Sequence, residues 1–207
     1  MTTDPDRDER EITRVLQQWV LYRDAGDWER FAGVWASDGF MTATWFQGSA
    51  TDFIEISRTG FENGVRILHF LGGTAVDVDG DRAIAQTKMT ISQRASVHDV
   101  DVDVVCTGRF YDFFRRDPEG WRVVRRQPIY EKDRMDPVAP DAALTLDRTL
   151  LESFPVGYRH LAYLQSQIGY TIHPALPGLV GPEVETLYRE GREWLAGSAL
   201  PGQALAL

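Results

Sequence analysis

The sequence contains one cysteine, Cys106, among its 207 residues, so an intrachain disulfide is excluded. Its four histidines, His69, His98, His160 and His173, are scattered along the chain. No Cys/His cluster therefore has the ligand spacing of a zinc site. The acidic run DVDVDVV, residues 99–105, contains no glycine or loop pattern typical of a calcium site. We expect no bound metal.

Long apolar runs and clusters of basic residues are also missing. No apolar run approaches the ~18 residues of a membrane-spanning helix, and the first ten residues, MTTDPDRDER, are acidic and polar. The chain carries 31 acidic and 22 basic residues, a formal net charge of −9. Nucleic acid and anionic membrane surfaces repel such a chain. We therefore expect a soluble cytoplasmic protein that binds neither nucleic acid nor membranes.

Apolar residues are plentiful enough for a core, since they make up 43% of the chain and include six tryptophans. Ile12, Leu16 and Val20 recur every fourth residue, which predicts an amphipathic first helix. Gly26 is typical of its end, and Asp27 of the N-cap of a second helix over residues 28–37. A third helix is expected after a capping box at residues 49–52.

Strand-like stretches follow these helices. Turn signals at Asp79-Gly80 and at residues 118–120 predict consecutive antiparallel hairpins. Helices followed by a meander of long strands indicate an α+β fold, with the helices on one face of an antiparallel sheet. The expected strands cover residues 40–46, 65–78, 82–97, 102–114 and 121–130.

The segment DPVAP, residues 136–140, is a candidate boundary. We expect one domain over residues 1–135 and a helical C-terminal extension over residues 136–207. The pieces of this extension are amphipathic but short, so they are expected to pack on the first domain or on a neighbouring subunit. Its last helix, residues 183–197, would either close a pocket or contact a neighbour.

Asp24 continues the four-residue row of the first helix one turn beyond Val20, so it should lie on or near the buried face. A carboxylate there needs a partner, because burying an unpaired charge is costly. His69, in the first long strand, is one candidate. A His–Asp pair can act as a general base. The alternative is that Asp24 bonds to nearby backbone or faces solvent, and that His69 is a core histidine.

Three stretches in order, YRDAGDWERFAGVWASDGF, ILHFLGGTAVDVDGDRAIA and GRFYDFFRRDPEGWRVVRR, resemble the SnoaL-like branch of the nuclear transport factor 2-like superfamily. The resemblance covers residues ~8–135. It implies a cone-shaped, strongly curved antiparallel sheet around a pocket that N-terminal helices close, and it implies no cofactor. The chain is similar in this way to scytalone dehydratase and hexachlorocyclohexane dehydrochlorinase. In such relatives an aspartate that ends the first helix orients a strand histidine, which implies Asp24 and His69 as the catalytic pair.

The resemblance also implies residues that bind the substrate. Arg126 matches an arginine five residues after the tryptophan of the last strand, although it is also one of several basic residues there. Met41 and Phe110 would line the pocket, where packing is the alternative role. Trp19 stands where relatives often place a lysine or tyrosine, so a flat or aromatic substrate is favoured.

Three functions follow from these residues. The first is a cofactor-independent lyase, a dehydratase or related enzyme, that acts on a small hydrophobic substrate through the Asp24–His69 pair. The second is an isomerase or polyketide cyclase of the same fold, although residues 40–46 contain no carboxylate to act as a steroid-isomerase base. The third is a non-catalytic small subunit of an aromatic-ring dioxygenase. Cones of this kind often bury one sheet face, so a homo-oligomer, a dimer or trimer, is expected.

Overall fold

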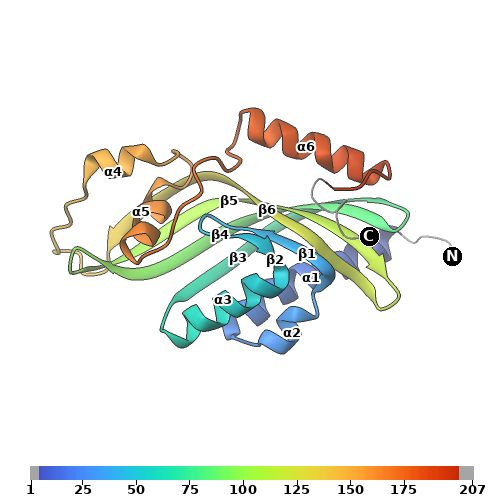
Figure 1. Ribbon diagram of the computed structural model, residues 1–207, viewed down its shortest axis with the longest axis horizontal. Helices are drawn as coiled ribbons and strands as arrows, with labels where there is room; N and C mark the ends of the chain where they lie inside the picture. The colour runs from blue at the N-terminus through green and yellow to red at the C-terminus, as the bar shows by residue number, and fades with distance from the viewer. Residues whose placement is uncertain (1–4, 201–207) are drawn as a thin grey trace.

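The computed structural model describes residues 5–200. A mixed α+β fold is confirmed: six strands form one curved sheet that does not close into a barrel, and the helices pack against it (Figure 1). The helices are α1 (Pro5–Ala25), α2 (Trp28–Ala32), α3 (Ala50–Glu62), α4 (Arg148–Ser153), α5 (Arg159–Gln167) and α6 (Pro182–Leu195). The strands are β1 (Trp35–Thr42), β2 (Gln47–Ser49), β3 (Arg66–Asp79), β4 (Arg82–Val97), β5 (Val100–Asp117) and β6 (Gly120–Pro137).

The sheet has the strand order β2-β1-β6-β5-β4-β3. The meander from β3 to β6 is antiparallel, as predicted. The pairing of β1 with β6 is parallel, which the turn signals did not predict, because no hairpin joins these two strands. β3 therefore lies at one edge of the sheet and carries His69 there.

The long strands bend, and their irregularities account for the curvature of the sheet. The register shifts between Leu71 and Thr74 in β3 and between Thr107 and Gly108 in β5. Such bulges bend a strand and increase its twist. A side chain at Gly108 would place its Cβ 2.0 Å from the carbonyl oxygen of Ile129, so this bend requires glycine.

The second and third helices start where the sequence predicted, but the second helix ends earlier than predicted. Asp27 caps α2 by accepting a hydrogen bond from the Arg30 backbone N–H at 3.3 Å. Ser49 caps α3 in the same way. However, α2 ends at Ala32, and Trp35 begins β1 rather than extending the helix. Gly33 follows the short helix directly, and the chain then pairs with β6 through Trp35 and Val123.

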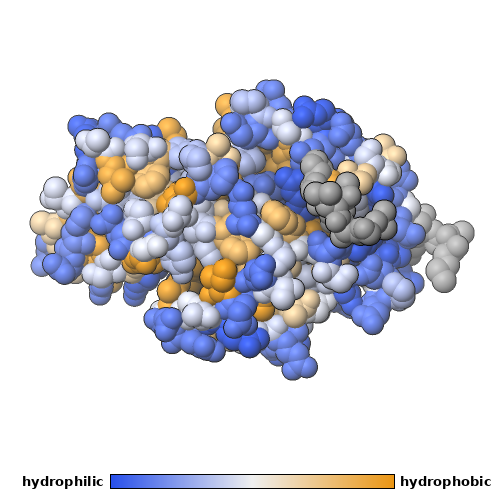
Figure 2. All heavy atoms as spheres, in the orientation of Figure 1, coloured by the Kyte–Doolittle hydropathy of each residue, from blue (hydrophilic) through white to orange (hydrophobic). Residues whose placement is uncertain are grey.

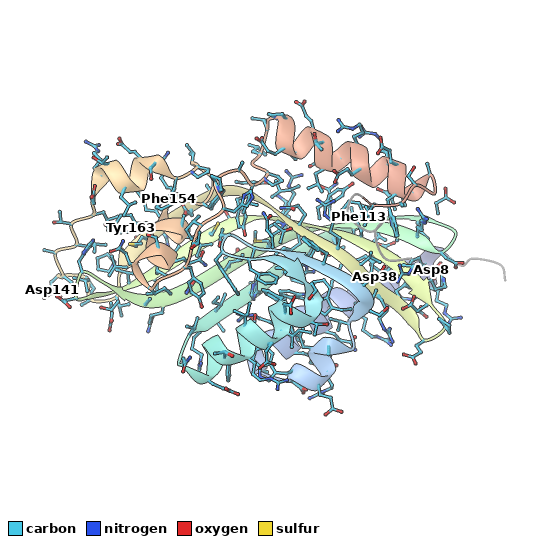
Figure 3. All side chains as sticks on the ribbon, viewed as in Figure 1. Asp8, Asp38, Phe113, Asp141, Phe154 and Tyr163 are labelled. Atoms are coloured by element: carbon cyan, nitrogen blue, oxygen red, sulfur yellow. The ribbon has the colours of Figure 1, made fainter. Side chains whose placement is uncertain are left out.

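Helices cover both faces of the sheet, which corrects the prediction of a single covered face. Trp19 and Phe31 on α1 and α2 belong to the main core on one face, and Leu161 on α5 joins the same core. On the other face, Leu187 and Trp194 of α6 pack against a second cluster that includes Phe113. In Figure 3 the labelled Phe113 lies on the side of the sheet that α6 covers.

The expected boundary at residue 135 falls two residues before the end of β6, which continues to Pro137 and pairs there with Val102. The extension that follows packs on the cone through α5 and α6, and the backbone N–H of Tyr130 in β6 donates to the carbonyl oxygen of Pro177. Residues 201–207 of the predicted extension lie outside the described residues. Figure 2 shows that the outward surfaces of α3 and α6 are largely hydrophilic, with apolar atoms beside α4 and α5.

Candidate active site

A narrow cavity of about 40 Å³ lies between the sheet, the N-terminal helices and α5. Most of its walls are apolar and many are aromatic, as in typical small-molecule sites. Its apolar side chains include Trp19, Met41, Trp45, Phe53, Ile67 and Phe110. Its polar side chains are Arg23, Thr44, His69, Tyr130 and Gln165.

Asp24 and His69 contact each other through both carboxylate oxygens. Oδ1 of Asp24 lies 2.8 Å from Nδ1 of the His69 ring, and Oδ2 accepts the backbone N–H of His69 at 2.6 Å. Because an ionised carboxylate only accepts hydrogen bonds, we assign the ring proton to Nδ1. The Nε2 atom then carries the lone pair, and His69 lines the cavity. This is the orientation that a general base needs.

The sequence explains why Asp24 ends the first helix at this place. Leu16 and Val20 are buried on the face of α1 that packs on the sheet, and Asp24 lies one turn beyond Val20 on the same row. Gly26, with φ of +73°, then ends the helix in a conformation that favours glycine. α1 packs along β3, so the last turn of the helix reaches the strand that carries His69.

The environment of His69 keeps its ring neutral near neutral pH. Burial lowers the pKa of His69, because the charged ring loses its hydration, and the nearby charges of Arg23 and Arg126 act in the same direction. The hydrogen bond and the charge of Asp24 raise it, but burial has the larger effect. A neutral ring with its lone pair on Nε2 is the form that accepts a proton.

Trp19 lies between the histidine and a buried charge pair. Its ring meets the His69 ring edge to face, with centroids 5.4 Å apart. The guanidinium of Arg126 lies 4.1 Å from the ring centroids of both Trp19 and Phe110. Arg126 has no exposed surface and forms two hydrogen bonds to Asp112, at 2.7 and 2.9 Å. Arg126 thus supports two cavity walls from behind rather than lining the cavity itself.

Part of the cavity wall is polar, and the extension contributes to it. Thr44, in the loop after β1, donates to Oε1 of Gln165 in α5. Nε2 of Gln165 donates to Oε1 of Gln93 in β4 at 3.0 Å. Tyr130 of β6 is also buried here, and burial raises the pKa of its hydroxyl well above the usual value. The extension therefore contributes Leu161 and Gln165 of α5 to the cavity. By contrast, α6, which was expected as a possible closing helix, lies on the other face of the sheet.

A second histidine–aspartate pair has similar distances but another role. His160 Nδ1 lies 2.8 Å from Oδ1 of Asp133, and Oδ2 of Asp133 accepts the backbone N–H groups of His160 and Leu161. These N–H groups are in the first turn of α5, where they have no partner within the helix, so Asp133 supplies their hydrogen-bond acceptor. Neither His160 nor Asp133 lines the cavity. His160 therefore has a structural role at the start of α5.

The predicted site residues are therefore close together. Trp19, Met41 and Phe110 line the cavity with His69, Asp24 orients His69, and Arg126 lies behind. Their catalytic and substrate-binding roles stay predictions. Sequence reasoning missed Arg23, although it continues the buried series Leu16 and Trp19 along the helix. It also missed Gln165, because no local pattern indicates that the extension folds back over the cavity.

In the range of residues 5–200, no group of three or more histidine, cysteine, aspartate or glutamate side chains is arranged to hold a metal ion. No helix within it combines the length and apolar composition that crossing a membrane requires.

The fold and cavity define a class of small α+β cone proteins. The family model of the SnoaL-like domain matches residues 7–127, so the chain belongs to the SnoaL-like family. A PEP2-like protein of Fusarium vanettenii is 32% identical over 95% of this chain and 90% of its own length. Pea pathogenicity protein 2 of the same fungus is 32% identical over 91% of this chain and 86% of its length.

Solved structures agree on the fold. The crystal structure of a proposed scytalone dehydratase from Novosphingobium aromaticivorans is similar, with a TM-score of 0.51 and 16% sequence identity. The match covers 68% of this chain and 93% of that one. At this identity the likeness supports the fold alone.

Proposed function

We propose that the protein is a cofactor-independent lyase in which His69 is the general base and Asp24 orients it. The observation that carries the proposal is the pair of short contacts from Asp24 to the ring and the backbone of His69, at the wall of an apolar cavity. Membership of the SnoaL-like family also supports this class of reaction.

The chemistry needs one residue for two steps. His69 Nε2 removes a proton from a carbon of the substrate, and Asp24 stabilises the imidazolium that forms. A bond to a neighbouring oxygen or other leaving group then breaks, and the imidazolium returns the proton to that group. The aromatic walls formed by Trp19, Phe53 and Phe110 suit a flat, hydrophobic substrate.

The alternatives differ in what they require of the cavity. A cyclase with an acidic base has no support here, because within the described chain no aspartate or glutamate side chain lines the cavity. An isomerase would use the same histidine and return the proton to a different carbon. A structural subunit would need a larger partner, which co-purification would detect.

The expected homo-oligomer and the cytoplasmic location stay predictions. Sedimentation velocity would measure the oligomeric state.

A panel of hydroxylated cyclic ketones in D₂O tests the proposal. Nuclear magnetic resonance would follow both loss of the leaving group and exchange of the carbon-bound proton for deuterium. His69→Ala is expected to abolish both and to leave the fold intact, as judged by circular dichroism. His98→Asn is a matched control, because His98 lies outside the cavity and its φ of 51° suits asparagine. Full activity in His69→Ala would contradict the proposal.

A further inference from the structure

Arg23 is a buried cation at the cavity wall that the general-base chemistry does not use. The residue is 5% exposed and lines the cavity beside His69. One guanidinium nitrogen, Nη1, donates to the carbonyl oxygen of Ile67 at 3.2 Å. Its Nε is buried and has no hydrogen-bond partner among the described residues. An unpaired buried donor is costly, so an acceptor supplied by a bound ligand would stabilise it.

The charge of Arg23 is only partly neutralised within the protein. Asp24 is its one ion-pair partner in the described chain, and the contact from Nη1 to Oδ1 is 3.5 Å long. Both oxygens of Asp24 already accept shorter hydrogen bonds from His69, at 2.6 and 2.8 Å. No carboxylate from residues 5–200 lines the cavity. A buried guanidinium in an apolar cavity with so little compensation favours an anion beside it.

We propose that Arg23 binds a negatively charged oxygen of the substrate, so that the site takes a flat, apolar molecule bearing an oxyanion next to the carbon that reacts. This rests on the proposed function for the direction of proton transfer, but the binding itself does not depend on it. Guanidinium groups bind such oxygens through charge-assisted hydrogen bonds.

Two groups supply such an oxygen. The first is a carboxylate that is ionised before the substrate binds. The second is a carbonyl next to the reacting carbon. When Nε2 of His69 takes the proton, the C–H electron pair forms a carbon–carbon double bond, and the carbonyl π electrons move to oxygen. The enolate oxygen then carries the charge beside Arg23, which stabilises the intermediate without any further reactant.

Isothermal titration calorimetry with three small rings tests the inference. 4-Nitrophenolate and benzoate are anionic, and 4-nitrotoluene is a neutral molecule of similar shape. We expect the wild type to bind at least one anion about tenfold more tightly than the neutral ring, as a charge-assisted hydrogen bond provides. Stronger binding of benzoate assigns a carboxylate, and stronger binding of 4-nitrophenolate assigns an enolate or phenolate.

Substitutions of Arg23 test whether this residue causes the preference for anions. Arg23→Met is expected to lose the preference for anions and to keep its affinity for 4-nitrotoluene, whereas Arg23→Lys keeps part of the preference. Arg125→Met is the matched control, because Arg125 is a partly buried arginine that pairs with Glu190 outside the cavity. Circular dichroism verifies folding, and Arg23→Lys keeps the test valid if Arg23→Met does not fold.

The inference is overturned if Arg23→Met, or Arg23→Lys in its place, keeps the full preference, or if the wild type has none. His69→Ala separates this result from the proposed function. It is expected to keep the preference for anions while losing turnover. Unchanged turnover in His69→Ala would contradict the proposed role of His69 as the general base. The proposal that Arg23 binds an anion would not be affected by that result.

Discussion

Arg126 and Asp112 form a two-hydrogen-bond ion pair on adjacent strands, and neither side chain has any exposed surface. Two charges taken fully out of water are stable only as a pair, because either one alone loses its hydration without compensation. The Arg126 guanidinium packs against the rings of Trp19 and Phe110 from behind the cavity, so the ion pair helps to hold these two rings in position.

Asp112→Ala is therefore expected to destabilise the protein by about 3–5 kcal/mol, because it leaves the Arg126 charge buried and unpaired. The double variant Asp112→Leu/Arg126→Leu should cost less than Asp112→Ala, since no charge remains to be buried. Urea unfolding followed by tryptophan fluorescence measures both. A double variant less stable than Asp112→Ala would show that the pair contributes more than mutual compensation.

Asp24→Asn should reduce turnover by about a hundred- to ten-thousand-fold with little change in fold. Asparagine can still accept the backbone N–H of His69, but its amide can donate to Nδ1 and so move the ring proton to Nε2. That tautomer cannot accept a proton from the substrate. Long-range ¹H–¹⁵N spectra of the histidine ring would show the change directly. An unchanged tautomer together with normal turnover would contradict the assigned role of Asp24.

As the pH is lowered, the activity should reach half its maximum at a pH below 6.5. Burial lowers the pKa of His69 from its ordinary value of 6.5, so the neutral base persists to a lower pH than in an exposed histidine. The profile of kcat/KM against pH should therefore have an acid limb below pH 6.5. An acid limb above this value would mean that Asp24 outweighs burial.

The same shift predicts how stability depends on pH. Between the lowered folded pKa and the unfolded value of about 6.5, the unfolded chain binds more protons at this position. The contribution of neutral His69 is therefore fully present above pH 6.5 and is lost as the pH falls through that window. Comparing the free energy of unfolding of the wild type and His69→Gln across this range measures the effect. The two curves should converge toward acid pH, and parallel curves would contradict the predicted shift.

Gln165→Ala tests the contribution of the extension to the cavity. The substitution leaves the Thr44 hydroxyl and the Gln93 amide oxygen without their buried partner, at a cost of about 1–3 kcal/mol. Gln167→Ala is the control, because Gln167 is exposed on the same helix. Thermal unfolding should separate the two variants clearly. Equal stability would show that the buried contacts of Gln165 contribute little.

Local pattern was enough for most of the elements. The four-residue row of α1, the caps at Asp27 and Ser49, and the hairpin turns each depend on residues close in sequence. The prediction that the second helix includes Trp35 was wrong because of a contact with a residue distant in sequence. The helical spacing of Trp35 from Phe31 was real, but pairing with β6 draws the segment into the sheet, and no short-range signal reports such a partner.

The sequence by itself determined that Asp24 faces inward, because the period of a helix places it one turn beyond Val20. Its partner was named by family resemblance and not by pattern, since Asp24 and His69 are 45 residues apart. Only the tertiary structure decided that Arg126 is paired with Asp112 behind the cavity, that Arg23 lies at its wall, and that Gln165 completes it. These contacts depend on which strands are neighbours and on where the chain returns, and both are set by packing of the whole domain rather than by local propensity.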